Sequence, residues 1–481
     1  MSHPQPSATA PPTTAAPAAP PSAAAPAPTP SPPRTVAWRE AAERLRAAAV
    51  TEPGRLRVIG AVLAALLVVL GTVTAWQVAA RASAADAVVH HSQPLSAAAA
   101  DIYRSLADAD STAASGFLAG GQEPRKVRER YDADITLASE SLVKAAANTD
   151  GSGTARDRIT ELNKKLPQYT ALVEAARANN RQGLPLGGAY LRYASDQMRD
   201  ELLPAASKLY DAETGRLHSD YADAKSWPWA ALGLGVLTLA ALGWAQQRTF
   251  LRTNRVFNQG LLAATGATTV VLLWLAVGHG VARSELQTSY AHGAHSLQVL
   301  TETRIAALKA RSNENLTLVA RGAIITKGNH DFYEDKFGEG MHDLIGSGGG
   351  DPAPDSLLGR ALALADDEKG RAPVASVIKD VREWQSRHGN SRSQDESGDY
   401  RSALKLVIGE QGNSQGSTGE TFDSVDEALN KALKHEQGQF DRAADDGRGA
   451  LSGLAAGAAV LAVLAAAGAV LGIGRRLSEY R

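Results

Sequence analysis

The sequence predicts an all-α fold in which four transmembrane helices carry two helical bundles. The first observation is a set of four apolar runs of 18–24 residues that contain no Asp, Glu, Lys or Arg: 58–80, 227–244, 261–281 and 450–473. A helix of that length crosses a hydrocarbon core of about 30 Å. The second observation is that apolar residues between the runs recur at helical steps of three, four and seven. The third is that alanine is abundant while aromatic residues make up 5%, which favours helices with closely packed seams.

The chain opens with a tail, residues 1–57, that precedes the first apolar run. Residues 1–33 are nearly all Pro, Ala, Ser and Thr, so they cannot form a core and are expected to be disordered with some polyproline II character. The tail is either a docking segment for a partner or a plain spacer. Because small residues 82–84 follow the run at 58–80, that run is alternatively a cleaved signal peptide, although its length favours a membrane span.

Positive charge predicts the orientation of the spans. Arginines precede the first run, fill the short connection 245–260 without any acid, and follow the fourth run in the tail 474–481. Basic flanks stay in the cytoplasm, so both termini are expected inside and the long segments 81–226 and 282–449 outside. Tryptophans at span edges support these limits. The residues that anchor this topology are Arg248, Arg252, Arg255, Arg475, Arg476, Trp76, Trp227, Trp229 and Trp244.

The first long segment is predicted to be an up-down-up-down four-helix bundle. Its first helix continues from span one to about Leu118, where Gly120, Gly121 and Pro124 end it. The second and third helices are expected at about 124–148 and 154–179. The fourth helix begins near Leu186 and is expected to run directly into span two.

The second long segment repeats this plan less regularly. A long helix is expected from span three to about Ile325, with breaks at 346–354, 389–398 and 409–419 and a final helix from about Glu420 into span four. Residues 106–120 align with 308–322 at an offset of 202, and 213–217 match 436–440. We therefore expect an internal duplication of a span–bundle–span unit.

Composition and motifs indicate a protein that is not an enzyme. Cysteine is absent, which excludes thiol catalysis and cysteine-ligated metals. The segment 282–449 has 20 basic and 27 acidic residues, which argues against nucleic acid as a partner. No phosphate-binding loop, nucleophile elbow or zinc-protease motif occurs, and the histidines are scattered. We therefore expect no catalytic residue, no metal site and no cofactor.

Polar residues on the first helix of each bundle are the candidates for contact with a ligand or partner. They are Asp108, Asp110, Asn313, Glu314 and Arg321. An arginine with a set of donors and acceptors suits a small charged ligand held between helices. The alternative is that these side chains are solvated helix faces with i, i+3 and i, i+4 pairs.

Span four contains glycines at four-residue steps: Gly449, Gly453 and Gly457, then Gly468 and Gly472. Small residues on one face allow helices to approach closely. This pattern indicates a tight contact inside the four-span bundle or between protomers of a homo-oligomer, or it arises by chance in a span rich in alanine and glycine.

A span that leads directly into a four-helix bundle resembles the sensor modules of bacterial chemoreceptors and histidine kinases. The acidic, small-residue stretch 106–121, followed by Pro124 and Tyr131, has the look of their first helix. The doubled unit, with its Asn313–Leu318 core and N-terminal tail, resembles the actinobacterial four-span membrane adaptors that act with a glutamine/glutamate-binding lipoprotein and the cytosolic Ser/Thr protein kinase G. The resemblance covers about residues 55–481 and transfers no functional residue position by position.

This resemblance implies a signalling adaptor in the cell membrane. Its partners are then an extracytoplasmic solute-binding lipoprotein, a cytosolic Ser/Thr kinase and the lipid bilayer. Two alternatives stay open: a direct sensor of a small molecule, and a structural envelope scaffold without a signalling role.

Overall fold

The computed structural model describes residues 52–121, 123–148, 153–253, 258–348, 350–410 and 414–478. The tail up to residue 51 and Arg255 lie outside these residues, and so do the side chains of Arg252 and Arg476. Within the described residues the chain is helical and has no strand, only an isolated bridge between Ile325 and Asp331. The predicted all-α fold is confirmed.

The first half of the chain forms a bundle with two extensions. Helices α2 (Glu52–Ala87) and α3 (Gln93–Leu118) are one continuous rod joined by a π-helical turn, η1 (Val88–Ser92). Helices α4 (Arg125–Asn148) and α5 (Gly153–Arg181) form the antiparallel pair beside it. The return path is α6 (Leu186–Gln197), η2 (Met198–Leu202), α7 (Leu203–Lys225) and α8 (Trp229–Thr253).

The second half begins in the same way. Helix α9 (Gln259–Thr288) continues through the π-helical turn η3 (Ser289–Ala294) into α10 (His295–Ala320). Short helices follow, α11 (Phe332–Ile345) and α12 (Leu357–Leu364), then α13 (Glu368–Glu396) and α14 (Tyr400–Ile408). The return path is α15 (Thr418–Leu451) and α16 (Leu454–Ser478).

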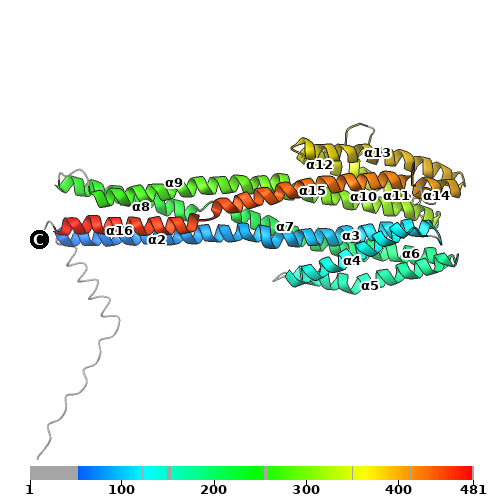
Figure 1. The fold of residues 1–481 in the computed structure, drawn as a ribbon, viewed down its shortest axis with the longest axis horizontal. Helices are drawn as coiled ribbons and strands as arrows, with labels where there is room; N and C mark the ends of the chain where they lie inside the picture. Colours follow the sequence, from blue (N-terminus) through cyan, green and yellow to red (C-terminus); the bar gives the residue numbers. More distant parts are fainter. Residues whose placement is uncertain are drawn as a thin grey trace, which may run out of the picture.

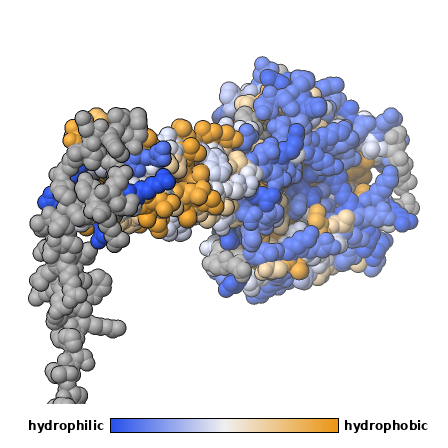
Figure 2. Space-filling model, turned by 60° about the vertical axis from the view of Figure 1, so that its left-hand side comes forward, coloured by the Kyte–Doolittle hydropathy of each residue, from blue (hydrophilic) through white to orange (hydrophobic). Residues whose placement is uncertain are grey.

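The molecule is an elongated rod with the four apolar segments at one end and the two bundles at the other (Figure 1). Helices α3, α7, α10 and α15 run along its middle, while α4 and α5 lie along one edge and α12 and α13 along the opposite edge. Figure 2 shows a hydrophobic band over the spans and a hydrophilic head beyond it. All four apolar helices are long enough to cross a membrane, so the prediction of a multi-pass membrane protein is confirmed.

Several helix ends differ from the sequence prediction. The α7 helix does not run into span two, because Ser226 is extended (ψ 134°) and α8 starts only at Trp229. The α10 helix ends at Ala320 rather than Ile325, since Arg321 adopts a left-handed conformation (φ 47°). The predicted break at 389–398 is wrong up to Glu396, because α13 runs through it.

The spans pack tightly where glycines remove side-chain volume. Gly468 and Gly472 of α16 lie against Gly260 of α9, and Gly457 lies against the Trp274 ring. Gly449 has nothing within 4 Å of its would-be Cβ. Gly453 has a positive φ of 78° at the break between α15 and α16. The glycines of the predicted pattern thus have different roles: Gly468 and Gly472 form a close helix contact, and Gly453 allows a turn.

Candidate functional site

The two halves meet along α3 and α10, which lie side by side and parallel. Lys309 Nζ donates to Tyr103 Oη at 2.8 Å, Ser312 Oγ donates to Asp110 Oδ2 at 2.6 Å, and Asn315 Nδ2 donates to Ser115 Oγ at 2.7 Å. Asp110 and Ser312 are 202 residues apart, which is the offset of the duplication. Equivalent residues of two copies touch only where a two-fold axis passes. The contact of Asp110 with Ser312 is what a two-fold arrangement of the predicted repeats requires, and we call this arrangement the internal pseudo-dimer. The π-helical turns that begin at Val88 and Ser289, 201 residues apart, agree with it.

Asp110 sits at the centre of this interface. It is 7% exposed and accepts hydrogen bonds from Ser312, from Ser195 Oγ at 2.9 Å and from Tyr169 Oη at 3.4 Å. Burial raises the pKa of Asp110, although these hydroxyl donors oppose the shift. Because both of its oxygens have protein donors, Asp110 links the two halves and is not a free ligand for a solute.

Asp108 belongs to an ion cluster on one side of the interface. Arg130 of α4 donates to both of its oxygens, at 3.0 and 3.1 Å, and reaches Asp426 of α15 at 3.4 Å. Arg304 of α10 donates to both oxygens of Asp426 at 2.6 and 3.0 Å. The cluster therefore ties α3 and α4 of the first half to α10 and α15 of the second.

Asp134 gives the same cluster a proton-binding group. Its side chain is 9% exposed, and Arg104 approaches it only to 3.9 Å. Burial, then the neighbouring charge of Asp108, raises the pKa of Asp134 to about 8. At neutral pH this carboxyl is therefore largely protonated.

Glu314 anchors a second buried network inside the second bundle. It is 1% exposed and pairs with Arg311. It also accepts hydrogen bonds from Trp384 Nε1 at 3.1 Å and from His388 Nδ1 at 3.0 Å, and His388 Nε2 lies 3.1 Å from Glu334. Burial lowers the pKa of His388, but the bonds to Glu314 and Glu334 outweigh it and raise that pKa to about 9.

The remaining two predicted candidates lie further out. Asn313 is partly exposed and lines a cleft between the halves. Arg321 stacks on the Tyr400 ring at 3.7 Å. The five residues predicted to contact a ligand or partner thus do not form one site. The alternative of solvated helix faces does not hold for Asp108, Asp110 and Glu314, which are buried. In the described residues, no group of three or more His, Asp or Glu is arranged to hold a metal ion.

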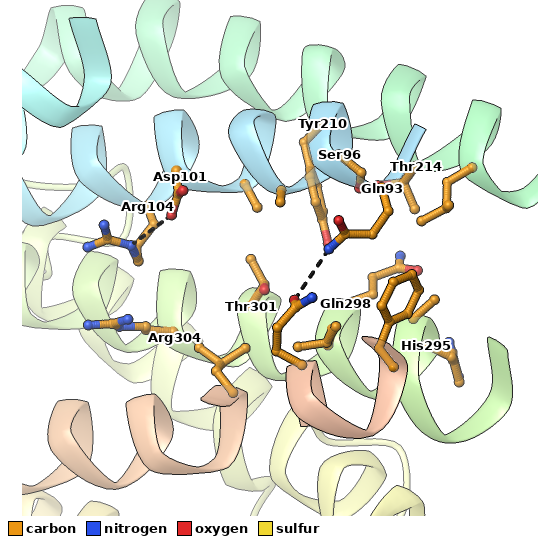
Figure 3. A pocket seen from close by; sticks show the side chains of 18 of the residues that line it. Gln93, Ser96, Asp101, Arg104, Tyr210, Thr214, His295, Gln298, Thr301 and Arg304 are labelled. Atoms are coloured by element: carbon orange, nitrogen blue, oxygen red, sulfur yellow. Dashed lines mark hydrogen bonds and ion pairs between the residues drawn. The ribbon is translucent and has the colours of Figure 1, made fainter. Parts of the chain in front are cut away.

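A central cavity of about 410 Å³ lies among α3, α7, α10 and α15, on the span side of the ion cluster. Figure 3 shows Arg104 and Arg304 projecting from opposite helices at one end and Gln93, Thr214 and His295 toward the other. Arg304 is held by Asp426 at 2.6 Å, whereas Arg104 is paired more loosely, at 3.8 Å with Asp101 and 3.9 Å with Asp108 and Asp134. Sequence reasoning missed both arginines, although they stand 200 residues apart, close to the duplication offset.

Polar contacts at the head end of the spans hold the broken return helix. Arg81 of α2 donates to the carbonyls of Ser226 at 2.8 Å and Trp227 at 3.0 Å. Arg283 of α9 donates to the Lys225 carbonyl at 2.6 Å. Arg81 and Arg283 are themselves 202 residues apart. Two equivalent arginines therefore converge on one helix break, so α7 and α8 are coupled to both incoming helices.

One family model matches the first bundle. Residues 84–222 match the family model described as an actinobacterial sensor domain. The matched segment starts in α2 and ends in α7, so it covers the first bundle without the apolar runs on either side. No curated protein and no solved structure matches the chain. The match supports a sensor role for this part of the chain.

Proposed function

We propose that this protein is a non-enzymatic signal relay in the cell membrane. In this proposal the two bundles lie outside the cell, receive the amino-acid-dependent state of a solute-binding lipoprotein, and pass it to a cytosolic Ser/Thr kinase. The match of residues 84–222 to a sensor domain supports the sensing role. The arginines that flank the apolar segments, such as Arg57, Arg248 and Arg475, support cytoplasmic termini.

One observation carries the proposal. The two helices that form the interface between the bundles, α3 and α10, continue without a break into the spans α2 and α9. A change in how α3 and α10 pack is therefore transmitted along the rods as a small shift or rotation, because packed helices have discrete arrangements. A partner that favours one arrangement by about 1–3 kcal/mol suffices for useful coupling.

The two kinds of span have different parts in this mechanism. Along their described residues, the incoming rods each contain one π-helical turn and no other interruption, and the first return path also contains one, η2; such turns adjust helix register and often mark a functional site. The returning helices are interrupted, at 226–228 and at Ser452–Gly453. We therefore assign transmission to α2 and α9, and assign α8 and α16 to supporting the span bundle.

Crosslinking in cells tests the relay. The full-length protein is crosslinked with and without added glutamate, purified and analysed by mass spectrometry. Recovery of a solute-binding lipoprotein together with a Ser/Thr kinase supports the proposal. Recovery of neither refutes it and favours a scaffold.

Insertions test the transmission path. Four glycines inserted after Ala85, inside the α2 rod, are expected to abolish the kinase response because they interrupt a continuous helix. The same insertion after Ser226, at the existing break, is the matched control and is expected to reduce the response only modestly. Equal responses from the two variants would show that the incoming rods do not carry the signal.

A direct small-molecule sensor is the second candidate function. It is favoured by the 410 Å³ cavity, which lies among the four central helices and has volume for a small solute. Saturable binding of an amino acid by the purified full-length protein, in the absence of any lipoprotein, would establish this alternative.

A further inference from the structure

The pseudo-dimer has two equivalent sides, and the structure fills only one of them. On the filled side, α3 and α4 face α10 and α15, and the Asp108–Arg130–Asp426 cluster occupies the space between them. The opposite side, where α10 and α11 face α3 and α7, holds a cleft of about 690 Å³.

The duplication explains why this cleft exists. At the offset of 202, the equivalent partner of Asp108 in the other half is Ala310. In the alignment of the return helices, which matches 213–217 with 436–440, the equivalent partner of Asp426 is Leu203. Both partners line the cleft. The ion cluster is thus replaced by an alanine and a leucine, which leave the space between the halves open.

The charges of the cleft decide what it can hold. Two cations of the lining are already neutralised: Arg199 pairs with Asp196 and with Asp200 at 3.3 Å, and Lys336 pairs with Glu339 at 2.5 Å.

The other charged groups of the lining are four acids, Asp110, Asp211, Glu302 and Asp343, and one lysine, Lys309. Burial, together with the nearby charge of Glu302, raises the pKa of Asp211. Glu302 accepts a bond from Gln298 at 3.0 Å and meets Arg360 only at 3.5 Å. Lys309 donates to a neutral tyrosine hydroxyl.

We propose that this cleft binds a small organic amine, with its ammonium group between Asp211 and Glu302. An ammonium there relieves the repulsion of two neighbouring carboxylates and forms charge-assisted hydrogen bonds. Lys309 lies seven residues beyond Glu302, about 10 Å along the helix, and its ammonium is placed to receive a carboxylate from the far end of an extended ligand. A basic amino acid such as lysine satisfies both ends, whereas a diamine satisfies only the acidic one.

This proposal does not rest on the signal relay. Its test measures only binding to the full-length protein in phosphatidylcholine nanodiscs. Titration calorimetry measures the binding of three probes: lysine, 1,5-diaminopentane and glutamate. Lysine is expected to bind more tightly than the diamine, and glutamate is expected not to bind. The double variant Asp211→Asn, Glu302→Gln is expected to weaken lysine binding by about 10- to 100-fold, because it loses the charged hydrogen bonds to the ammonium group.

Two variants separate the site from general effects. Lys309→Met is expected to weaken binding of lysine but not of the diamine. Asp423→Asn removes an acid from the filled side of the pseudo-dimer, where it meets Arg130 at 3.4 Å, and is the matched control expected to leave binding unchanged. Circular dichroism establishes that each variant is folded. Three results would each overturn the proposal: preference for glutamate, no saturable binding of an amine, or lysine binding by the folded double variant that equals that of the parent.

Discussion

Replacing Glu314 by Gln tests whether one buried carboxylate holds the second bundle together. The substitution keeps the shape of the side chain but removes the negative charge from between Arg311 and His388, which are 4% and 7% exposed. Removing one partner of a buried ion pair costs about 3–5 kcal/mol, because the remaining charge has no compensation. A bundle of this size then loses roughly 6–20 °C in apparent melting temperature.

Tryptophan fluorescence during heating provides the assay, because Trp384 is buried and donates to the same carboxylate. The protein is measured in nanodiscs. Glu427→Gln is the control: it makes the same chemical change in an exposed i, i+4 pair with Lys431 and is expected to leave the melting temperature unchanged. A Glu314→Gln variant that melts within about 2 °C of the parent would refute the reasoning.

The pH dependence of the same network has a defined sign. The pKa of His388 is raised to about 9 in the folded state from its ordinary value of 6.5. Its contribution to stability is therefore fully present below about pH 6.5 and is lost as pH rises through about 9. In His388→Gln this loss is expected to be smaller, which melting curves between pH 6 and pH 10 measure.

Three further predictions concern the interface and the spans. Asp134→Asn is expected to raise the melting temperature by an amount that grows from about pH 4 to about pH 8 and stays constant above it, because over this range the buried native carboxyl, with a pKa of about 8, holds a proton that the unfolded chain has lost; unchanged melting curves at pH 9 would contradict this. Gly472→Leu is expected to destabilise the span bundle by about 1–3 kcal/mol through overpacking, since a Cβ there lies 2.8 Å from the Gly260 Cα. The control is Gly474→Leu, which meets nothing within 4 Å, and equal melting of the two variants would refute the contact. Arg81→Met frees the carbonyls at the α7–α8 break and is expected to speed amide hydrogen exchange in the last turn of α7, measured by mass spectrometry; unchanged exchange would show that the arginine does not hold the break.

Long apolar runs and helical periodicity were sufficient to predict the spans and the all-α fold, because each depends on local composition. Helix α4 is an example: the expected 124–148 is observed as Arg125–Asn148. The break after α7 was missed because Ser226 and Pro228 are flanked by strong helix formers on one side and an apolar run on the other. The arginines that hold this break, Arg81 and Arg283, lie just beyond spans one and three, so the signal for it is not local.

The candidate residues were predicted less well for the same reason. Asp108 and Glu314 have the polarity of surface residues, and only tertiary structure shows that Arg130 and His388 reach them. The duplication offset contained more information than the individual residues. Applied to the arginines, it pairs Arg81 with Arg283, and applied to Asp110 it gives the residue that Asp110 contacts, Ser312.

The departures from symmetry between the two halves are the most informative feature of the head. A pseudo-dimer of identical units has two equal sides, so a ligand or partner that binds one side must also bind the other. Here one side is closed by Arg130 and the other is open over Ala310. In the proposal above, binding at the open side acts on α3 and α10 from one direction only, so it is expected to push the two incoming rods unequally. An asymmetric input of this kind shifts one rod more than the other, whereas a symmetric one keeps α2 and α9 equivalent; in the proposed relay, this unequal movement of the spans is what the cytosolic partner reads.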